Sequence, residues 1–145
     1  GRSYVGTPID YTIAVLPVSP RTEALTVGTT VTGTLATPGE SVTYTFSVGQ
    51  PASVVFDSLS LRGDIEWSLR NASGAVVSPR RLHQSDSYDI GGTNVLALAP
   101  GDYTLTIDGV ADATGAYAFR LLDAAAAERL EPGVALNATL GDQGQ

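Results

Sequence analysis

The chain has 145 residues, and its 15 acidic residues outnumber its 8 basic residues, giving a net charge of −7. Every basic residue is Arg, and the chain contains no Cys. The lack of Cys excludes a disulfide scaffold, a thiolate metal site and a cysteine nucleophile. We expect no nucleic-acid partner, because phosphate contacts come mainly from clustered Lys and Arg, and this acidic chain has no Lys.

Apolar residues alternate with hydroxyl residues along much of the chain, the pattern of half-buried antiparallel strands. In residues 41–48, for example, Val42, Tyr44 and Phe46 share one face while Ser and Thr occupy the other. In chain order, we predict strands near residues 10–16, 29–35, 41–48, 52–58, 64–70, 75–77, 93–98, 102–108 and 117–121. The segment at 75–77 carries a weaker signal than the others.

Turns rich in Gly and Pro separate these segments, as at Pro38-Gly39 and Pro100-Gly101. Eight to nine short strands at this spacing predict an all-β fold, an antiparallel β-sandwich that is jelly-roll-like. The one helix-like stretch, residues 123–130, has no amphipathic stripe and precedes Pro132-Gly133, which indicates a linker or one short turn.

The two ends of the chain resemble each other. Tyr11–Leu16 is echoed by Tyr117–Leu122 at an offset of 106 residues, and Ala24–Leu35 by Arg129–Leu140 at an offset of 105. Chance similarity between strands rich in Thr and Val is the alternative explanation, but two blocks in the same order favour a repeat. We therefore predict the end of a preceding repeat in residues 1–20, one β-sandwich repeat in residues 21–122, and a linker with the first strand of the next repeat in residues 123–145.

The composition predicts that this repeat is located outside the cell. Thr, Ser, Gly and Ala are abundant and only 16% of residues are charged, as in secreted or cell-surface modules. The chain starts at Gly1 and has no Met, so we expect it to be an excised fragment, a processed product or a tagged chain. No run of about 18 apolar residues is present, so we expect no membrane insertion.

The central stretch from Thr34 to Leu122 carries four ordered motifs. They are a turn into a Tyr-x-Phe strand, a Gly-Asp strand ending in a Gly turn, a Pro-Gly hairpin into a Tyr strand, and a closing Gly-x-Tyr strand. Their residues are Gly39–Phe46, Gly63–Gly74, Ala99–Ile107 and Thr114–Leu121. In this order the motifs resemble the bacterial pre-peptidase C-terminal (PPC-like) domain family.

That resemblance implies a β-sandwich accessory domain of secreted proteins, found beside peptidases and also repeated in tandem in large, adhesin-like surface proteins. The internal repeat favours the second setting, a non-enzymatic structural spacer or adhesion unit located extracellularly or at the bacterial cell surface. The alternative is an accessory domain that targets a secreted hydrolase or peptidase to its substrate. Expected partners are neighbouring repeats of the same protein, other copies through sheet edges, and an extracellular polymer ligand.

Calcium is the one cofactor that the sequence suggests, since some relatives in the family bind it and oxygen-bearing residues are common in the predicted loops. These residues are Asp57, Asp64, Asp86, Asp89, Asp108, Asp112 and Thr114. The best local candidate is the loop with Asp108, Asp112 and Thr114, because calcium prefers carboxylate and carbonyl oxygens from loops. The loop lacks the EF-hand spacing, and ordinary Asp/Gly turn chemistry is the alternative.

Other motifs do not indicate catalysis. His83 stands near Ser85 and Asp86, but a local run does not supply the converging geometry of a triad. Asp64 and Glu66 share one strand face without a cleft between them, so a solvated face is the simpler interpretation. Arg62-Gly63-Asp64 matches the tripeptide that integrins recognise, but such triplets are frequent by chance and do not indicate integrin binding. The aromatic residues fall mostly at inward positions, which predicts a core and not a sugar-binding platform.

Overall fold

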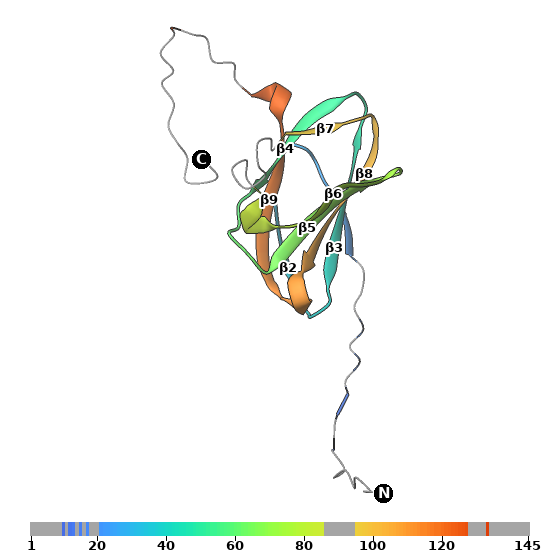
Figure 1. Cartoon of the computed structure of the whole chain (residues 1–145), viewed down its shortest axis with the longest axis vertical. Coiled ribbons are helices and arrows are strands. Elements are labelled where there is room, and N and C mark those ends of the chain that lie inside the picture. The colour runs from blue at the N-terminus through green and yellow to red at the C-terminus, as the bar shows by residue number, and fades with distance from the viewer. Residues whose placement is uncertain are drawn as a thin grey trace, which may run out of the picture.

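The computed structural model describes residues 21–85 and 95–127, with residues 10, 12, 13, 15, 17 and 133 individually. The described chain forms nine strands and three single-turn 3-10 helices (Figure 1). The strands are β1 (Arg21–Ala24), β2 (Thr30–Leu35), β3 (Ser41–Val48), β4 (Ala52–Ser58), β5 (Ile65–Asn71), β6 (Gly74–Arg81), β7 (Val95–Leu98), β8 (Gly101–Gly109) and β9 (Gly115–Asp123). The 3-10 turns are η1 (Leu82–Gln84), η2 (Val110–Asp112) and η3 (Ala124–Ala126). Within the described part, no helix is long and apolar enough to cross a membrane.

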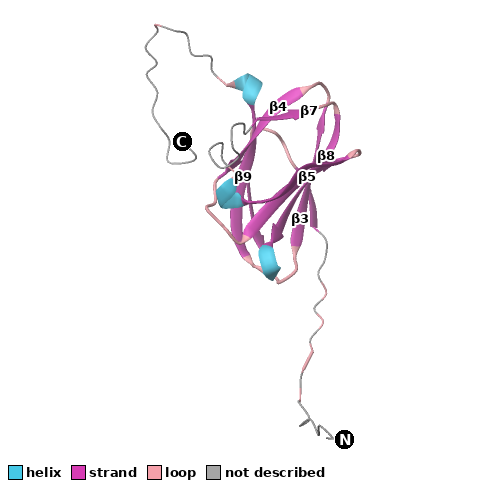
Figure 2. Cartoon of the chain, viewed as in Figure 1, coloured by secondary structure: helices cyan, strands magenta, loops and turns pink. Residues whose placement is uncertain are grey.

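The strands form two sheets, which confirms the predicted all-β sandwich (Figure 2). One sheet has the order β1-β3-β8-β5-β6 and the other has the order β2-β9-β4-β7. Neighbouring strands are antiparallel, except that β1 runs parallel to β3 with Arg21 beside Val42.

Most predicted strands lie within a residue or two of the observed ones, and three differences stand out. β1 was not predicted, because its four residues are mostly exposed and carry no apolar alternation. β6 has eight residues where only residues 75–77 were expected. The segment predicted near 10–16 lies largely outside the described residues. The expected turn after β9 is confirmed as η3.

Alternation along β3, β5, β8 and β9 buries every second side chain between the sheets. Aromatic rings from both sheets meet there. Phe56 of β4 stacks on Trp67 of β5 with ring centroids 3.9 Å apart. Phe119 of β9 and Tyr44 of β3 form a T-shaped pair with ring centroids 5.4 Å apart. The prediction that the aromatic side chains form the core is confirmed for Tyr44, Phe46, Phe56, Trp67, Tyr103, Tyr117 and Phe119. Tyr4 and Tyr88 lie outside the described residues.

The chain crosses the sandwich from one end to the other. Loops 36–40, 59–64 and 110–114 lie together, because Leu35 pairs with Gly115 and Ile65 with Gly109; we call this the Arg62 end. β1 starts near this end and β9 runs away from it, so that Asp123 lies at the opposite end beside Val54 (Figure 1). We call that the Asp123 end. The described body therefore begins at one end of the sandwich and finishes at the other.

Gly33 of β2 makes room for the ring of Tyr117, its neighbour in β9. A Cβ atom at Gly33 would lie far inside van der Waals contact with Tyr117 Cζ and Oη. The Tyr117 ring therefore occupies the space that a side chain at residue 33 would fill, and an aromatic ring in this position is a known way to stabilise a glycine in an edge strand.

We predict that Gly33→Ala lowers the free energy of unfolding by about 1–3 kcal/mol, because the Tyr117 ring must leave its position in the core. Chemical denaturation monitored by tryptophan fluorescence measures this change. Gly49→Ala is the control, since a Cβ atom there meets nothing within 4 Å, and we expect a change within about 0.5 kcal/mol. Equal effects in the two variants would contradict the proposed ring contact.

Candidate functional site

The Arg62 end gathers the polar side chains that the sequence singled out. Arg62 donates from Nε and Nη2 to the two carboxylate oxygens of Asp64 at 2.7 and 2.8 Å. Nη2 also donates to the carbonyl oxygen of Thr114 at 2.9 Å. Gly115 has φ +140°, and a Cβ atom there would overlap the guanidinium group. Arg62 thus links the loop before β5 to the loop before β9.

This arrangement bears directly on the predicted calcium loop. The Thr114 carbonyl oxygen accepts from Arg62, and Asp108 Oδ1 accepts from the backbone N–H of Gly109 at 2.8 Å. Asp112 is exposed. Among the described residues, no group of three or more His, Asp or Glu side chains is placed to hold a metal ion. The calcium site at Asp108, Asp112 and Thr114 stays a prediction.

Backbone shape accounts for the glycine in that loop. A Cβ atom at Gly109 would collide with the carbonyl oxygen of Ala113. Ala111 and Asp112 adopt left-handed φ values of 52° and 61°, which are strained for residues with a side chain, although Asp tolerates them better than Ala. The turn closes with the Ala113 N–H donating to the Val110 carbonyl oxygen.

The remaining acidic candidates are divided between ion pairs and undescribed segments. Asp57 of β4 accepts from Arg120 Nε at 2.5 Å, directly across from it in β9. Asp64 is held by Arg62, so the Arg and Asp of the Arg62-Gly63-Asp64 tripeptide bind each other. Asp86 and Asp89 lie outside the described residues.

His83 is placed as a structural residue of this end. Its backbone N–H donates to the Arg62 carbonyl oxygen at 3.1 Å, and its Nδ1 lies 3.3 Å from the same oxygen. A Cβ atom at Gly63 would be 3.1 Å from the imidazole ring, which therefore packs over this glycine. Ser85 is buried, and its hydroxyl accepts from Trp67 Nε1 and donates to the carbonyl oxygen of Arg81.

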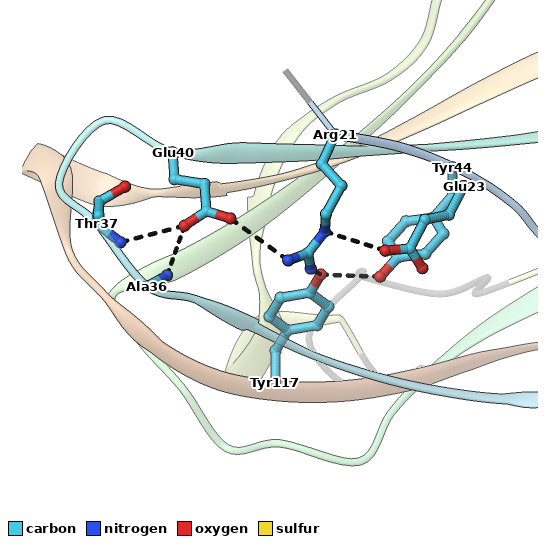
Figure 3. A network of polar contacts seen from close by, with 7 residues as sticks. All are labelled: Arg21, Glu23, Ala36, Thr37, Glu40, Tyr44 and Tyr117. Carbon is cyan, nitrogen blue, oxygen red and sulfur yellow. Dashed lines mark hydrogen bonds and ion pairs between the residues drawn. The ribbon is translucent and has the colours of Figure 1, made fainter. Parts of the chain in front are cut away.

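A second cluster surrounds Arg21, the first residue of β1 (Figure 3). Its Nε lies 3.0 Å from Glu23 Oε1, and its Nη1 lies 3.5 Å from Glu40 Oε1. Its Nη2 donates to the hydroxyl of Tyr117 at 3.5 Å, and that hydroxyl is 2.8 Å from the hydroxyl of Tyr44. Arg21 therefore joins β1 to β3 and, across the sandwich, to β9. We call these five residues the Arg21 cluster.

Hydrogen bonds and burial fix the protonation states of Glu40 and Tyr117 in this cluster. Glu40 Oε2 accepts from the backbone N–H groups of Ala36 at 2.6 Å and Thr37 at 3.1 Å. These bonds, and then the charge of Arg21, lower the pKa of Glu40. Burial, followed by the hydrogen bond to Tyr44, raises the pKa of the Tyr117 hydroxyl, which therefore stays neutral.

A groove of about 710 Å³ runs along β6. Its polar wall includes Glu66, Arg80, Arg81 and Gln84, and Arg80 Nη1 donates to the Gln84 carbonyl oxygen at 3.5 Å. Trp67 and Phe56 also line it, but each is at most 2% exposed. Their faces stack on one another instead of facing solvent.

Sequence reasoning missed the Arg21 cluster. Arg21 and Tyr117 are 96 residues apart, and β1 has no strand pattern to show that it pairs with β3. The available signal was composition: in a chain whose only cations are arginines, each one next to an acidic residue is a candidate ion pair. Arg21 and Arg62, both two residues before an acid, fit this rule.

No family model and no curated protein matches the chain. Solved structures do resemble it. The pre-peptidase C-terminal domain of a collagenase from Bacillus anthracis is 19% identical, with a TM-score of 0.49 over 74% of this chain and 99% of that one. The periplasmic g-type lysozyme inhibitor PliG of Salmonella Typhimurium is 12% identical, with a TM-score of 0.49 over 70% of this chain and 98% of that one. PliG of Aeromonas hydrophila is 10% identical, with a TM-score of 0.44 over 71% and 99%.

Identities below 20% and TM-scores below 0.5 assign the chain neither a family nor a function. The two-sheet fold is therefore assigned from the strands of this chain and their pairing.

We predict that acid destabilises the protein partly through Asp64 and Glu40. Hydrogen bonds from Arg62 lower the pKa of Asp64 below its ordinary 3.8, and the bonds at Glu40 lower its pKa below 4.5. A lowered pKa means that the folded state holds the proton less tightly, so this stabilisation is present above the ordinary pKa and is lost as the pH falls below it.

The measurement is the urea midpoint at about pH 6 and about pH 3, on either side of the ordinary pKa values. We expect the fall in midpoint to be smaller in the Asp64→Asn, Glu40→Gln double variant than in the parent chain. An unchanged fall would show that other groups control the acid response.

Calcium titration of the chelator-treated chain tests the predicted metal site. If Asp108, Asp112 and Thr114 bind calcium, we expect heat of binding in calorimetry that is lost in Asp112→Asn. This substitution removes the charge and keeps a residue that tolerates left-handed φ. Absence of heat at millimolar calcium would overturn the site.

Proposed function

We propose that the chain is a non-enzymatic, extracellular β-sandwich repeat that acts as a structural spacer or adhesion unit in a large bacterial surface protein. The observation that carries this proposal is the path of the chain, which begins at the Arg62 end and leaves at the Asp123 end. A module connected in this way adds its full length to an array. β9 alone spans about 30 Å, at 3.3–3.4 Å per residue.

One detail of backbone geometry supports the tandem arrangement. In the predicted repeat, Gly28 corresponds to Gly133 at the offset of 105 residues. Both are in turns, and both adopt left-handed φ, 90° at Gly28 and 87° at Gly133. Left-handed φ is readily adopted by glycine and rarely by other residues, so a shared glycine conformation at equivalent positions is expected if residues 129–140 begin the next repeat. On this reading the organisation is residues 1–20, 21–122 and 123–145.

The chemistry of the described surface also fits a structural role. Both arginines at the Arg62 end are paired with carboxylates, in the Arg62–Asp64 and Arg21–Glu40 pairs. A net charge of −7 keeps repeated units apart in solution and so favours an extended, soluble array. The PPC-like motifs and the composition support an extracellular location.

The alternative function, targeting a secreted hydrolase or peptidase to a polymer, is favoured by the groove along β6. Glu66, Arg80 and Arg81 place charges of both signs beside the apolar side chains of Val76 and Leu96. Co-sedimentation with insoluble extracellular polymers distinguishes targeting from a purely structural spacer. Targeting requires retention that is lost in an Arg81→Ala variant, whereas a spacer is not retained.

We predict that tandem chains are extended. A series with one, two or three units is made by repeating residues 21–125, which span the 105-residue offset of the predicted repeat, between the natural flanking segments. We expect the maximum dimension in small-angle X-ray scattering to rise by a constant step of about 30 Å or more per unit. A control series replaces residues 123–125 at every internal junction with Gly and Ser and is expected to give smaller steps, because such linkers are flexible. A maximum dimension that hardly grows with the number of units would contradict the spacer.

A further inference from the structure

The positions of β1 and β9 determine how tension would act on this sandwich. A pull on the two chain ends draws Arg21 away at the Arg62 end and Asp123 away at the Asp123 end, along the directions of β1 and β9. Hydrogen bonds between strands run across the strand direction, so tension along a strand loads many of them together instead of opening them one by one. Both terminal strands are therefore loaded in shear.

β9 and β1 are not equally protected. β9 lies between β2 and β4, and it pairs with β2 over residues 115–120 and with β4 over residues 119–123, so that its whole length is paired on at least one side. β1 has four residues and pairs with β3 on one side. Once β1 separated, the pull would reach Thr30 at the Asp123 side of β2, and β2 would peel from β9 one pair at a time. β1 is thus the strand whose attachment controls unfolding under tension.

Both ends of β1 are fastened beyond its own ladder. Just after β1, Leu25 is buried and its N–H donates to the Thr45 carbonyl oxygen at 2.9 Å. At the start, the Arg21 cluster holds the first residue of the strand through Glu40, which precedes β3, and Tyr117 of β9 (Figure 3). Arg21 thereby connects the strand that receives the load directly to the strand that passes it on.

We propose that the sandwich is a tension-bearing unit, and that the Arg21 cluster is the fastening that keeps β1 in place under load. This proposal rests on the spacer function and adds to it a mechanical property: the module resists force applied between its chain ends more than force applied in other directions. Arg21 acts here as a positioning residue, linking β1 to Tyr117 and Tyr44 across the two sheets.

The test is single-molecule force spectroscopy on the full chain held by handles at its two termini. Resistance to force depends on the unfolding rate constant and not on the equilibrium free energy of unfolding, so the experiment measures the unfolding rate at constant force. We expect Arg21→Ala to unfold about fivefold faster than the parent chain, the effect of losing roughly one or two bonds of this kind. The matched control is Arg70→Ala, which removes an exposed arginine from β5, a strand separated from β1 by β3 and β8. Its rate should stay within about twofold of the parent rate.

A second variant guards against a general loss of stability. Tyr117→Phe keeps the ring over Gly33 and removes the hydroxyl that contacts Arg21 and Tyr44. We expect it to unfold faster under terminal tension as well. If neither Arg21→Ala nor Tyr117→Phe changes the rate under force, the role of the Arg21 cluster is overturned.

Pulling direction provides the decisive comparison. The chain has no Cys, so Ala72→Cys in the turn between β5 and β6 creates a single attachment site at the Asp123 end. Force between Cys at this site and the C-terminal handle acts at one end of the sandwich, and we expect unfolding at lower force than with terminal handles. Equal forces in both geometries would overturn the tension-bearing proposal, even if scattering shows tandem chains to be extended. Compact tandem chains would instead overturn the spacer function.

Discussion

Contact between aromatic rings of opposite sheets is the constraint on which the rest of the structure depends. Phe56 of β4 lies flat against Trp67 of β5, with an interplanar angle of 4°. A one-residue slip in either strand would turn its ring to the solvent side, so this stack fixes the register of both sheets. The Trp67 ring also satisfies its one polar atom, because Nε1 donates to the buried hydroxyl of Ser85 at 2.7 Å. That bond places η1 against the sandwich and, with it, His83 over Gly63.

From this core, polar interactions extend outward at the Arg62 end. Phe119 packs edge-on against Tyr44, and the hydroxyls of Tyr44 and Tyr117 meet at the margin of the core. At position 21, beside these two hydroxyls, an apolar side chain would be partly exposed to solvent. A short polar side chain there would not reach the carboxylates of Glu23 and Glu40. Arg21 spans the distance, with its guanidinium between the Tyr117 hydroxyl and the carboxylate of Glu40. Arginine suits this position because it bonds several acceptors at once and stays charged.

The fold was largely predictable because its strands bury alternate residues. β3, β5, β8 and β9 each show the period-two pattern in sequence, and each is found where the pattern predicts it. β1 could not be found in this way, since a short and mostly exposed edge strand has no apolar face to reveal it. β6 was underestimated because Pro79 and the arginines after it break the pattern, although such residues suit an edge strand, where they discourage pairing with other chains. The polar clusters were harder still, because their members converge from loops far apart in the sequence.

The same clusters explain how an acidic chain uses its few cations. Arg21, Arg62 and Arg120 are each paired with a carboxylate. Arg62 links two loops at one end, Arg120 links β4 to β9, and Arg21 links β1 to both sheets. Surface ion pairs contribute little to global stability in most proteins, so their main effect here is on where strands and loops are held. Two of these pairs, at Arg21 and Arg120, lie on β1 and β9, the strands that carry the chain into and out of the sandwich. In the array that we propose, these two pairs would strengthen attachment along the line from one unit to the next.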